Sequence, residues 1–256
     1  MSPSINNDYV AAQLVNYLVS AGYRFDTTAI DWLDLCCNIE SIEVSPGKYT
    51  DDDLFCEIAW YAELARSKVL SSFVFQLMRF QFSWGALESI TRELVNSAKI
   101  ERFGTINALC GHLCNSGVPT DIIHQYKPVL DAFIERILQI KQFEPSMNRF
   151  GLSRTNNRVQ KDYINELGQG IFIVYQVRNH FAHGSMSLPF PIDPEDDDTE
   201  TIDNSLIEMA TTIVLMTIAM LLYIDVGEDD FVLSEFPFPE ENTTTAKEYL
   251  STLFTA

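Results

Sequence analysis

The residues best suited to chemistry lie in one run, from position 178 to position 184. It reads Arg-Asn-His-Phe-Ala-His-Gly, so an arginine, an asparagine and two histidines fall within six positions. At 3.6 residues per turn, Asn179 and His183 share a helix face, and Arg178 lies about 100° around the axis. An imidazole can transfer protons near neutral pH, and a planar guanidinium suits a phosphate. Arg178, Asn179 and His183 are therefore our candidate catalytic residues.

A helix must position this run at its C-terminal end. Apolar residues recur at helical spacing from residue 163 to residue 183, and Gly184 stands where a left-handed residue commonly ends a helix. A plainer interpretation stays open, because arginine and histidine near a helix C-terminus often only partner its last carbonyl groups.

A second long helix is predicted from residue 73 to residue 98, where apolar residues recur at steps of four and three. Glu88 on this helix is a candidate to hold Arg178 by a salt bridge, although a solvated glutamate is commoner on a bundle helix.

The remaining chain also favours helices, so we expect an all-α helical bundle with little or no sheet. The apolar segment from residue 206 to residue 224 is predicted to be a central bundle helix or to lie in a dimer interface, with a membrane span as the weaker reading. Other helices are expected at residues 7–21, 31–39, 104–114, 128–143 and 245–254, and one running through residues 60–65 with Asp51–Asp53 as its cap.

The pattern Arg178-Asn179-x-x-x-His183 resembles the motif of the HEPN superfamily, all-helical domains whose ribonuclease members carry Arg, a polar residue and His near a helix end. The run from Trp84 to Glu88 also looks like the acidic helix that many members place beside the motif helix. The resemblance covers residues 71–225 as an HEPN-like domain. It leaves residues 1–70 as an N-terminal helical extension and residues 226–256 as an acidic tail with a short helix.

This resemblance implies a metal-independent endoribonuclease without a cofactor, in which the ribose 2′-hydroxyl attacks the adjacent phosphate. His183 would act as general base or acid, and Arg178 would stabilise charge on the phosphate. Asn179 would orient the imidazole or a phosphate oxygen by hydrogen bonding. His180 is a supporting candidate on a different face of the motif helix. Glu88, on the neighbouring helix, is a second supporting candidate.

The family also implies partners and a setting. The substrate would be RNA, and the protein would form a homodimer across the motif helices. It would act in the cytoplasm as a toxin or effector in antiviral or toxin–antitoxin defence, with an antitoxin or regulatory protein as a possible partner. Many such toxins carry a tyrosine just after the motif histidine, whereas Gly184-Ser185 follows here, which puts a nucleotidyltransferase partner in doubt.

The formal net charge of -19 opposes broad attraction to nucleic acid, because Lys and Arg bind the phosphate backbone. Acid-free residues 149–161 are the exception and supply four RNA-binding candidates: Arg149, Arg154, Arg158 and Lys161. The alternative function is a noncatalytic HEPN-like scaffold, or an interaction protein whose acidic surface, including Asp196–Asp198, binds a basic partner.

The five cysteines are expected to be reduced core thiols in an intracellular protein, since they form no dense disulfide framework. Cys110, His112 and Cys114 lack a second ligand pair at zinc-finger spacing, so no metal is predicted. The N-terminus shows no secretory signal, which indicates the cytoplasm.

Overall fold

The protein is an all-α bundle with one short strand pair. The computed structural model describes residues 5–21, 27–45, 57–140, 164–184, 188–191, 202–226, 232–234 and 243–253. Within these ranges the helices are α1 (Asn7–Ser20), α2 (Thr27–Asn38), α3 (Glu57–Leu94), α4 (Ser97–Phe103), α5 (Thr105–Cys114), α6 (Thr120–Gln139), α8 (Glu166–Ala182), α9 (Ile202–Asp225) and α10 (Ala246–Thr252). Strands β1 (Val232–Ser234) and β2 (Thr243–Thr245) pair antiparallel, with Val232 opposite Thr245. The predicted all-α class is confirmed, and the HEPN-like architecture stays a prediction.

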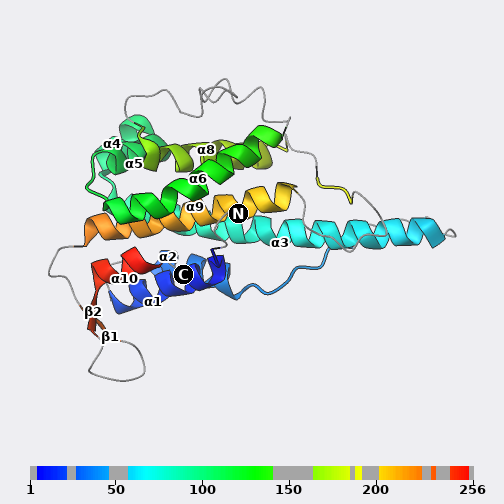
Figure 1. Cartoon of the computed structure of the whole chain (residues 1–256), viewed down its shortest axis with the longest axis horizontal. Helices are drawn as coiled ribbons and strands as arrows, with labels where there is room; N and C mark the ends of the chain where they lie inside the picture. Colours follow the sequence, from blue (N-terminus) through cyan, green and yellow to red (C-terminus); the bar gives the residue numbers. More distant parts are fainter. Residues whose placement is uncertain are drawn as a thin grey trace.

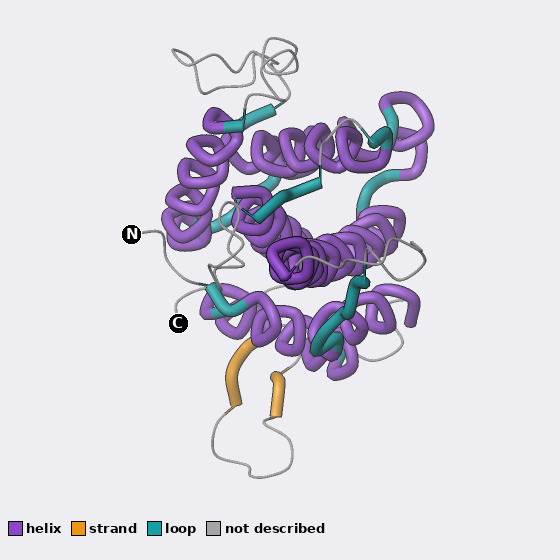
Figure 2. Tube along the Cα trace, turned by 90° about the vertical axis from the view of Figure 1, so that its right-hand side faces the viewer, coloured by secondary structure: helices purple, strands orange, loops and turns teal. Residues whose placement is uncertain are grey.

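Two long helices form the middle of the molecule. α3 and α9 pack along each other, with α4, α5, α6 and α8 on one side and α1, α2 and α10 on the other (Figure 1). The view turned by 90° shows the same two groups on opposite sides of this central pair (Figure 2). Helix α8, which ends in the candidate motif, therefore lies on the opposite side of α3 from α2.

Helix α9 is the core helix of the bundle. It contacts α1, α3, α6, α8 and α10, and side chains such as Leu206, Ile213 and Leu221 are fully buried. The segment Asn204–Asp225 is long and apolar enough to cross a membrane, yet 78% of its most apolar window is buried inside the protein. The prediction of a central bundle helix is confirmed. The alternative, that this segment lies in a dimer interface, stays a prediction.

Helix α3 is longer than the spacing predicted. Its buried positions Phe73, Phe80, Trp84 and Leu87 follow the predicted stripe, and the helix continues without a break back to Glu57. The proposed boundary between residues 70 and 71 therefore falls inside α3. The extension helices α1 and α2 pack on α9 and α3.

Two further helices differ from prediction at their starts. Helix α6 begins at Thr120 rather than at Pro128, which lies inside it on the exposed side. Proline lacks an N–H, but on that side water can satisfy the carbonyl left without its partner. Helix α2 begins at Thr27, four residues before the predicted start at Asp31. The predicted cap Asp51–Asp53 lies outside the described residues.

Candidate functional site

The N-terminal half of α8 is fixed by capping and by close packing. The Asn165 side chain accepts hydrogen bonds from the backbone N–H groups of Leu167 and Gly168, which begins the helix. A Cβ at Gly168 would lie 3.1 Å from Cys110 Cβ, and one at Gly170 would overlap the Tyr126 hydroxyl. Glycine at both positions therefore lets α5 and α6 approach the α8 backbone.

The C-terminal end of α8 forms as the sequence predicts. Gly184 has a φ of 61°, the left-handed conformation that glycine adopts without strain. The backbone N–H of His183 donates to the Asn179 carbonyl at 3.0 Å, and that of Gly184 donates to the Phe181 carbonyl at 3.1 Å. His183 is thus the C-cap residue, and it is exposed.

Arg178 lies against an aromatic ring of α3. Its guanidinium carbon is 5.2 Å from the centroid of the Trp84 ring, a cation–π distance. Its Nε atom is buried and has no hydrogen-bond partner in the described part of the chain. None of the carboxylates described in the structure pairs with Arg178.

Glu88 does not form the salt bridge predicted for it. One of its oxygens accepts a hydrogen bond from Trp84 Nε1 at 2.7 Å, and the other lies 3.7 Å from Arg92 Nη2. Both partners are four residues away on α3 itself. Trp84 therefore contacts both residues that the sequence suggested would pair directly. The resemblance placed the run from Trp84 to Glu88 beside the motif helix, but no contact of the Trp84 ring with Arg178 was predicted from the sequence.

The motif residues share the last turns of α8, but their side chains are not bonded to one another. Arg178 and Asn179 are half-buried, as is His180. No hydrogen bond joins the side chains of Arg178, Asn179 and His183 among the residues that the structure describes. Phe181 packs against Phe73 of α3 with ring centroids 6.0 Å apart, which holds the final turn in place. Convergence of the three side chains on one phosphate stays a prediction.

Other sequence candidates have different outcomes. Arg149, Arg154, Arg158 and Lys161 lie outside the described residues, as do Asp196–Asp198. Cys110 is buried, and its thiol donates to the Gly168 carbonyl at 3.4 Å. Among the described residues, no group of three or more His, Cys, Asp or Glu side chains could hold a metal ion.

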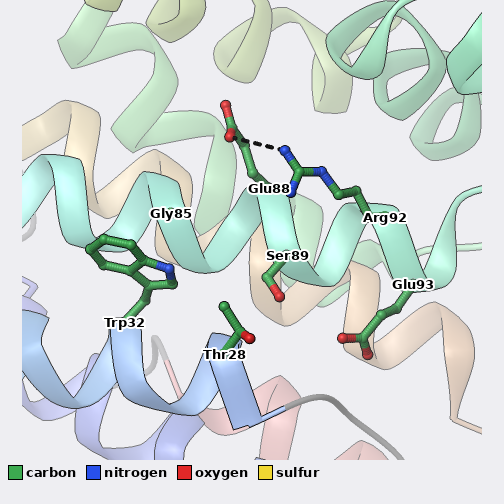
Figure 3. A pocket seen from close by; sticks show the side chains of 7 residues that line it. All are labelled: Thr28, Trp32, Gly85, Glu88, Ser89, Arg92 and Glu93. Atoms are coloured by element: carbon green, nitrogen blue, oxygen red, sulfur yellow. Dashed lines mark ion pairs between the residues drawn. The ribbon is translucent and has the colours of Figure 1, made fainter.

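A cavity that the sequence did not reveal lies between α2 and α3 (Figure 3). Its volume is about 400 Å³, and it is lined by Thr28, Trp32, Gly85, Glu88, Ser89, Arg92 and Glu93. The one available signal was Gly85, since a glycine inside a helix often marks a close approach. Glu88 belongs both to this lining and to the surroundings of Trp84.

Comparison with protein-family models, with curated proteins and with solved structures finds no match to this chain. The candidate site described above consists of the last two turns of α8, with Trp84 of α3 beneath Arg178.

Proposed function

We propose that this protein is a metal-independent endoribonuclease of HEPN type, acting on cytoplasmic RNA as a toxin or effector. The observation that carries the proposal is that the Arg178 guanidinium lies on the Trp84 ring and not against a carboxylate. The chain has 36 acidic and 17 basic residues, yet none of the described carboxylates pairs with this half-buried guanidinium. A positive charge held on an aromatic ring, five residues from an exposed histidine, is suited to binding a phosphate.

The chemistry assigned to these residues is transesterification. The imidazole of His183 accepts the proton of the ribose 2′-hydroxyl, and the 2′-oxygen attacks the phosphorus. The bond from phosphorus to the 5′-oxygen breaks, which leaves a 2′,3′-cyclic phosphate and a 5′-hydroxyl once that oxygen takes up a proton. Arg178 stabilises the charge on the phosphate oxygens, and Asn179 orients the imidazole or a phosphate oxygen.

A second copy of the chain would supply the remaining proton donor. One imidazole cannot be both base and acid in the same step, and of the two histidines at the end of α8 only His183 is exposed, since His180 is half-buried. A homodimer in which two α8 ends face each other would bring two His183 side chains to one phosphate. In such a dimer one imidazole acts as the base and the other, protonated, acts as the acid.

The decisive experiment is cleavage of a mixed RNA pool in EDTA, with the product ends identified. Wild-type protein should give cyclic phosphate ends, and His183→Ala should lower the rate by about 10² to 10⁴. Arg178→Lys, which keeps the charge but loses the planar fork, should also be impaired. The matched control is His124→Ala, because His124 is an exposed histidine on α6, away from the motif.

Two outcomes would contradict the proposal. Cleavage that survives unchanged in folded His183→Ala, or falls equally in His124→Ala, would show that the motif is not the catalytic site. Absence of cleavage by a well-folded wild-type dimer would favour the scaffold.

That scaffold is a noncatalytic interaction protein whose acidic surface binds a basic partner, favoured by the net charge of -19. It should tolerate both motif substitutions and respond to charge reversal at Asp196–Asp198.

A further inference from the structure

A second cavity is lined by α4 and α5, two short helices joined through Gly104. This glycine has a φ of 79°, a left-handed conformation that lets the chain turn directly from one helix into the other. The cavity has a volume of about 320 Å³, within the range of small-ligand sites. It is lined by Lys99, Phe103, Asn107, Ala108, Gly111 and Asn115. A cation, an aromatic ring and side-chain amides therefore surround one space.

The Phe103 ring is an open surface in this lining. Phe103 is 51% exposed, so about half of it has no protein neighbour to cover it. The Arg102 guanidinium lies 5.0 Å from the ring centroid, but Arg102 does not line the cavity and leaves the part of the ring that faces it uncovered. On α5, a Cβ built at Gly111 would meet nothing within 4 Å. A flat ring therefore has room to lie against Phe103.

The charge beside this ring is positive, although the protein as a whole is acidic. Lys99 and Arg102 are both exposed, and neither makes an ion pair with any residue that the structure describes. Lys99 and Phe103 are four residues apart and share one face of α4. Glu101 lies about 200° around the helix from each of them, so its carboxylate is on another face. The ammonium of Lys99 is therefore open to an anion bound beside the ring.

The side-chain amide of Asn115 supplies hydrogen bonds from α5. Its Nδ2 atom donates to the Gly111 carbonyl at 2.6 Å, which holds the amide against the helix. This bond uses one of two N–H groups, and the Oδ1 atom accepts no hydrogen bond from another described residue. A donor and an acceptor are thus left side by side, as the edge of a nucleobase requires.

We propose that this cavity binds one nucleotide, either in a single-stranded RNA or as a free nucleoside monophosphate. The base stacks on Phe103, its edge bonds to the Asn115 amide, and Lys99 holds the phosphate. An aliphatic carboxylate would satisfy Lys99 but leave the Asn115 amide without a partner. The cavity is distinct from the motif, because α5 packs on the start of α8 at Gly168 and not on its C-terminal end. The inference rests on the proposed function only where it takes RNA as the source of the nucleotide.

The test measures binding without cleavage. The probes are a short 2′-O-methyl oligoribonucleotide, which lacks the attacking hydroxyl, and adenosine monophosphate, each titrated in EDTA at near-physiological salt. Saturable binding of the oligonucleotide that is at least about tenfold tighter identifies an RNA strand as the source. Equal affinities identify a free nucleotide. Saturation by neither probe would overturn the proposal, whereas the cleavage assay with His183→Ala tests the motif separately.

Three variants separate this cavity from RNA binding elsewhere on the protein. Phe103→Leu removes the stacking ring, and Lys99→Gln removes the charge. Gly111→Leu fills the space, and the open surroundings of its Cβ leave the packing of α5 unchanged. Each should weaken binding of the tighter probe about tenfold, because a stacked base or a hydrogen bond to a charged group is lost or blocked.

Lys247→Gln is the matched control for the charge. It removes a lysine from α10, which lies on the opposite side of α3 and α9 from α4 and α5 (Figure 1). Unchanged binding in folded Phe103→Leu and Gly111→Leu, or equal weakening by Lys247→Gln, would refute the cavity as the site. Oligonucleotide binding that survives in the cavity variants but is lost in Arg178→Ala would refute it too, while leaving the proposed function intact.

Discussion

Substitution of Gly170 by alanine tests whether close packing on α6 and α9 holds the motif helix in place. A Cβ there would overlap the Tyr126 hydroxyl and lie 3.2 Å from Ile213 Cγ2. Tyr126 is buried, and its hydroxyl donates to the Leu167 carbonyl at 3.2 Å, so the phenol must move and lose this bond. Overpacking costs about 1–3 kcal/mol and an unpaired buried hydroxyl about 1–3 kcal/mol, while alanine returns about 1 kcal/mol of helix propensity. Gly170→Ala should therefore lower the free energy of unfolding by about 3 kcal/mol.

Urea denaturation followed by circular dichroism measures this loss, with two companion variants. Gly111→Ala on α5 is the control, because a Cβ at this position would meet nothing within 4 Å. This substitution should stabilise the protein by up to about 1 kcal/mol through the higher helix propensity of alanine. Tyr126→Phe removes the hydroxyl, so adding Gly170→Ala to it should cost about 2 kcal/mol less than in the wild type. Equal effects at Gly170 and Gly111, or strict additivity with Tyr126→Phe, would refute this packing argument.

Three other predictions concern stability and reactivity. Asp8→Asn should lower the free energy of unfolding by about 1–2 kcal/mol in urea, because buried Arg79 pairs with Asp8, whose side chain is 51% exposed and so screened. Burial, and to a smaller extent the charge of Lys99, lower the pKa of His112 below its ordinary value of 6.5. The folded protein therefore favours neutral His112, and this contribution to stability is complete above about pH 6.5 and is lost as the pH falls below it. Unfolding measured from about pH 7 to about pH 5 should depend less on pH in His112→Gln than in the wild type. Burial raises the pKa of Cys36 to about 12, so iodoacetamide at about pH 8 should label this thiol only after unfolding, as mass spectrometry can show.

Periodicity predicted the helices that bury one continuous face against the core. The stripe through Phe73, Phe80 and Leu87 is buried as expected, because one face of α3 packs on the core. The Gly184 cap also follows from local chemistry alone. Helix starts were less predictable, since Pro128 marks an N-terminus as readily as a tolerated position on an exposed helix face.

The candidate site was predictable in composition but not in contacts. The spacing of Arg178 and His183 places both in the last turns of α8, as found. Which α3 residue meets Arg178 depends on how the two helices are rotated against each other, and periodicity leaves that rotation open by about one residue. The cavity beside Trp32 depends on α2 docking at Gly85, a contact between residues far apart in sequence.

The replacement of a salt bridge by an aromatic contact changes what Arg178 can do. A carboxylate at hydrogen-bond distance would occupy the planar fork and neutralise its charge, so a phosphate would have to displace it. The Trp84 ring, 5.2 Å from the guanidinium carbon, holds the group by its face and uses none of its N–H donors. Glu88 is kept from Arg178 by its own bonds to Trp84 and Arg92. The arrangement that contradicts the sequence prediction is therefore better suited to anion binding than the arrangement predicted.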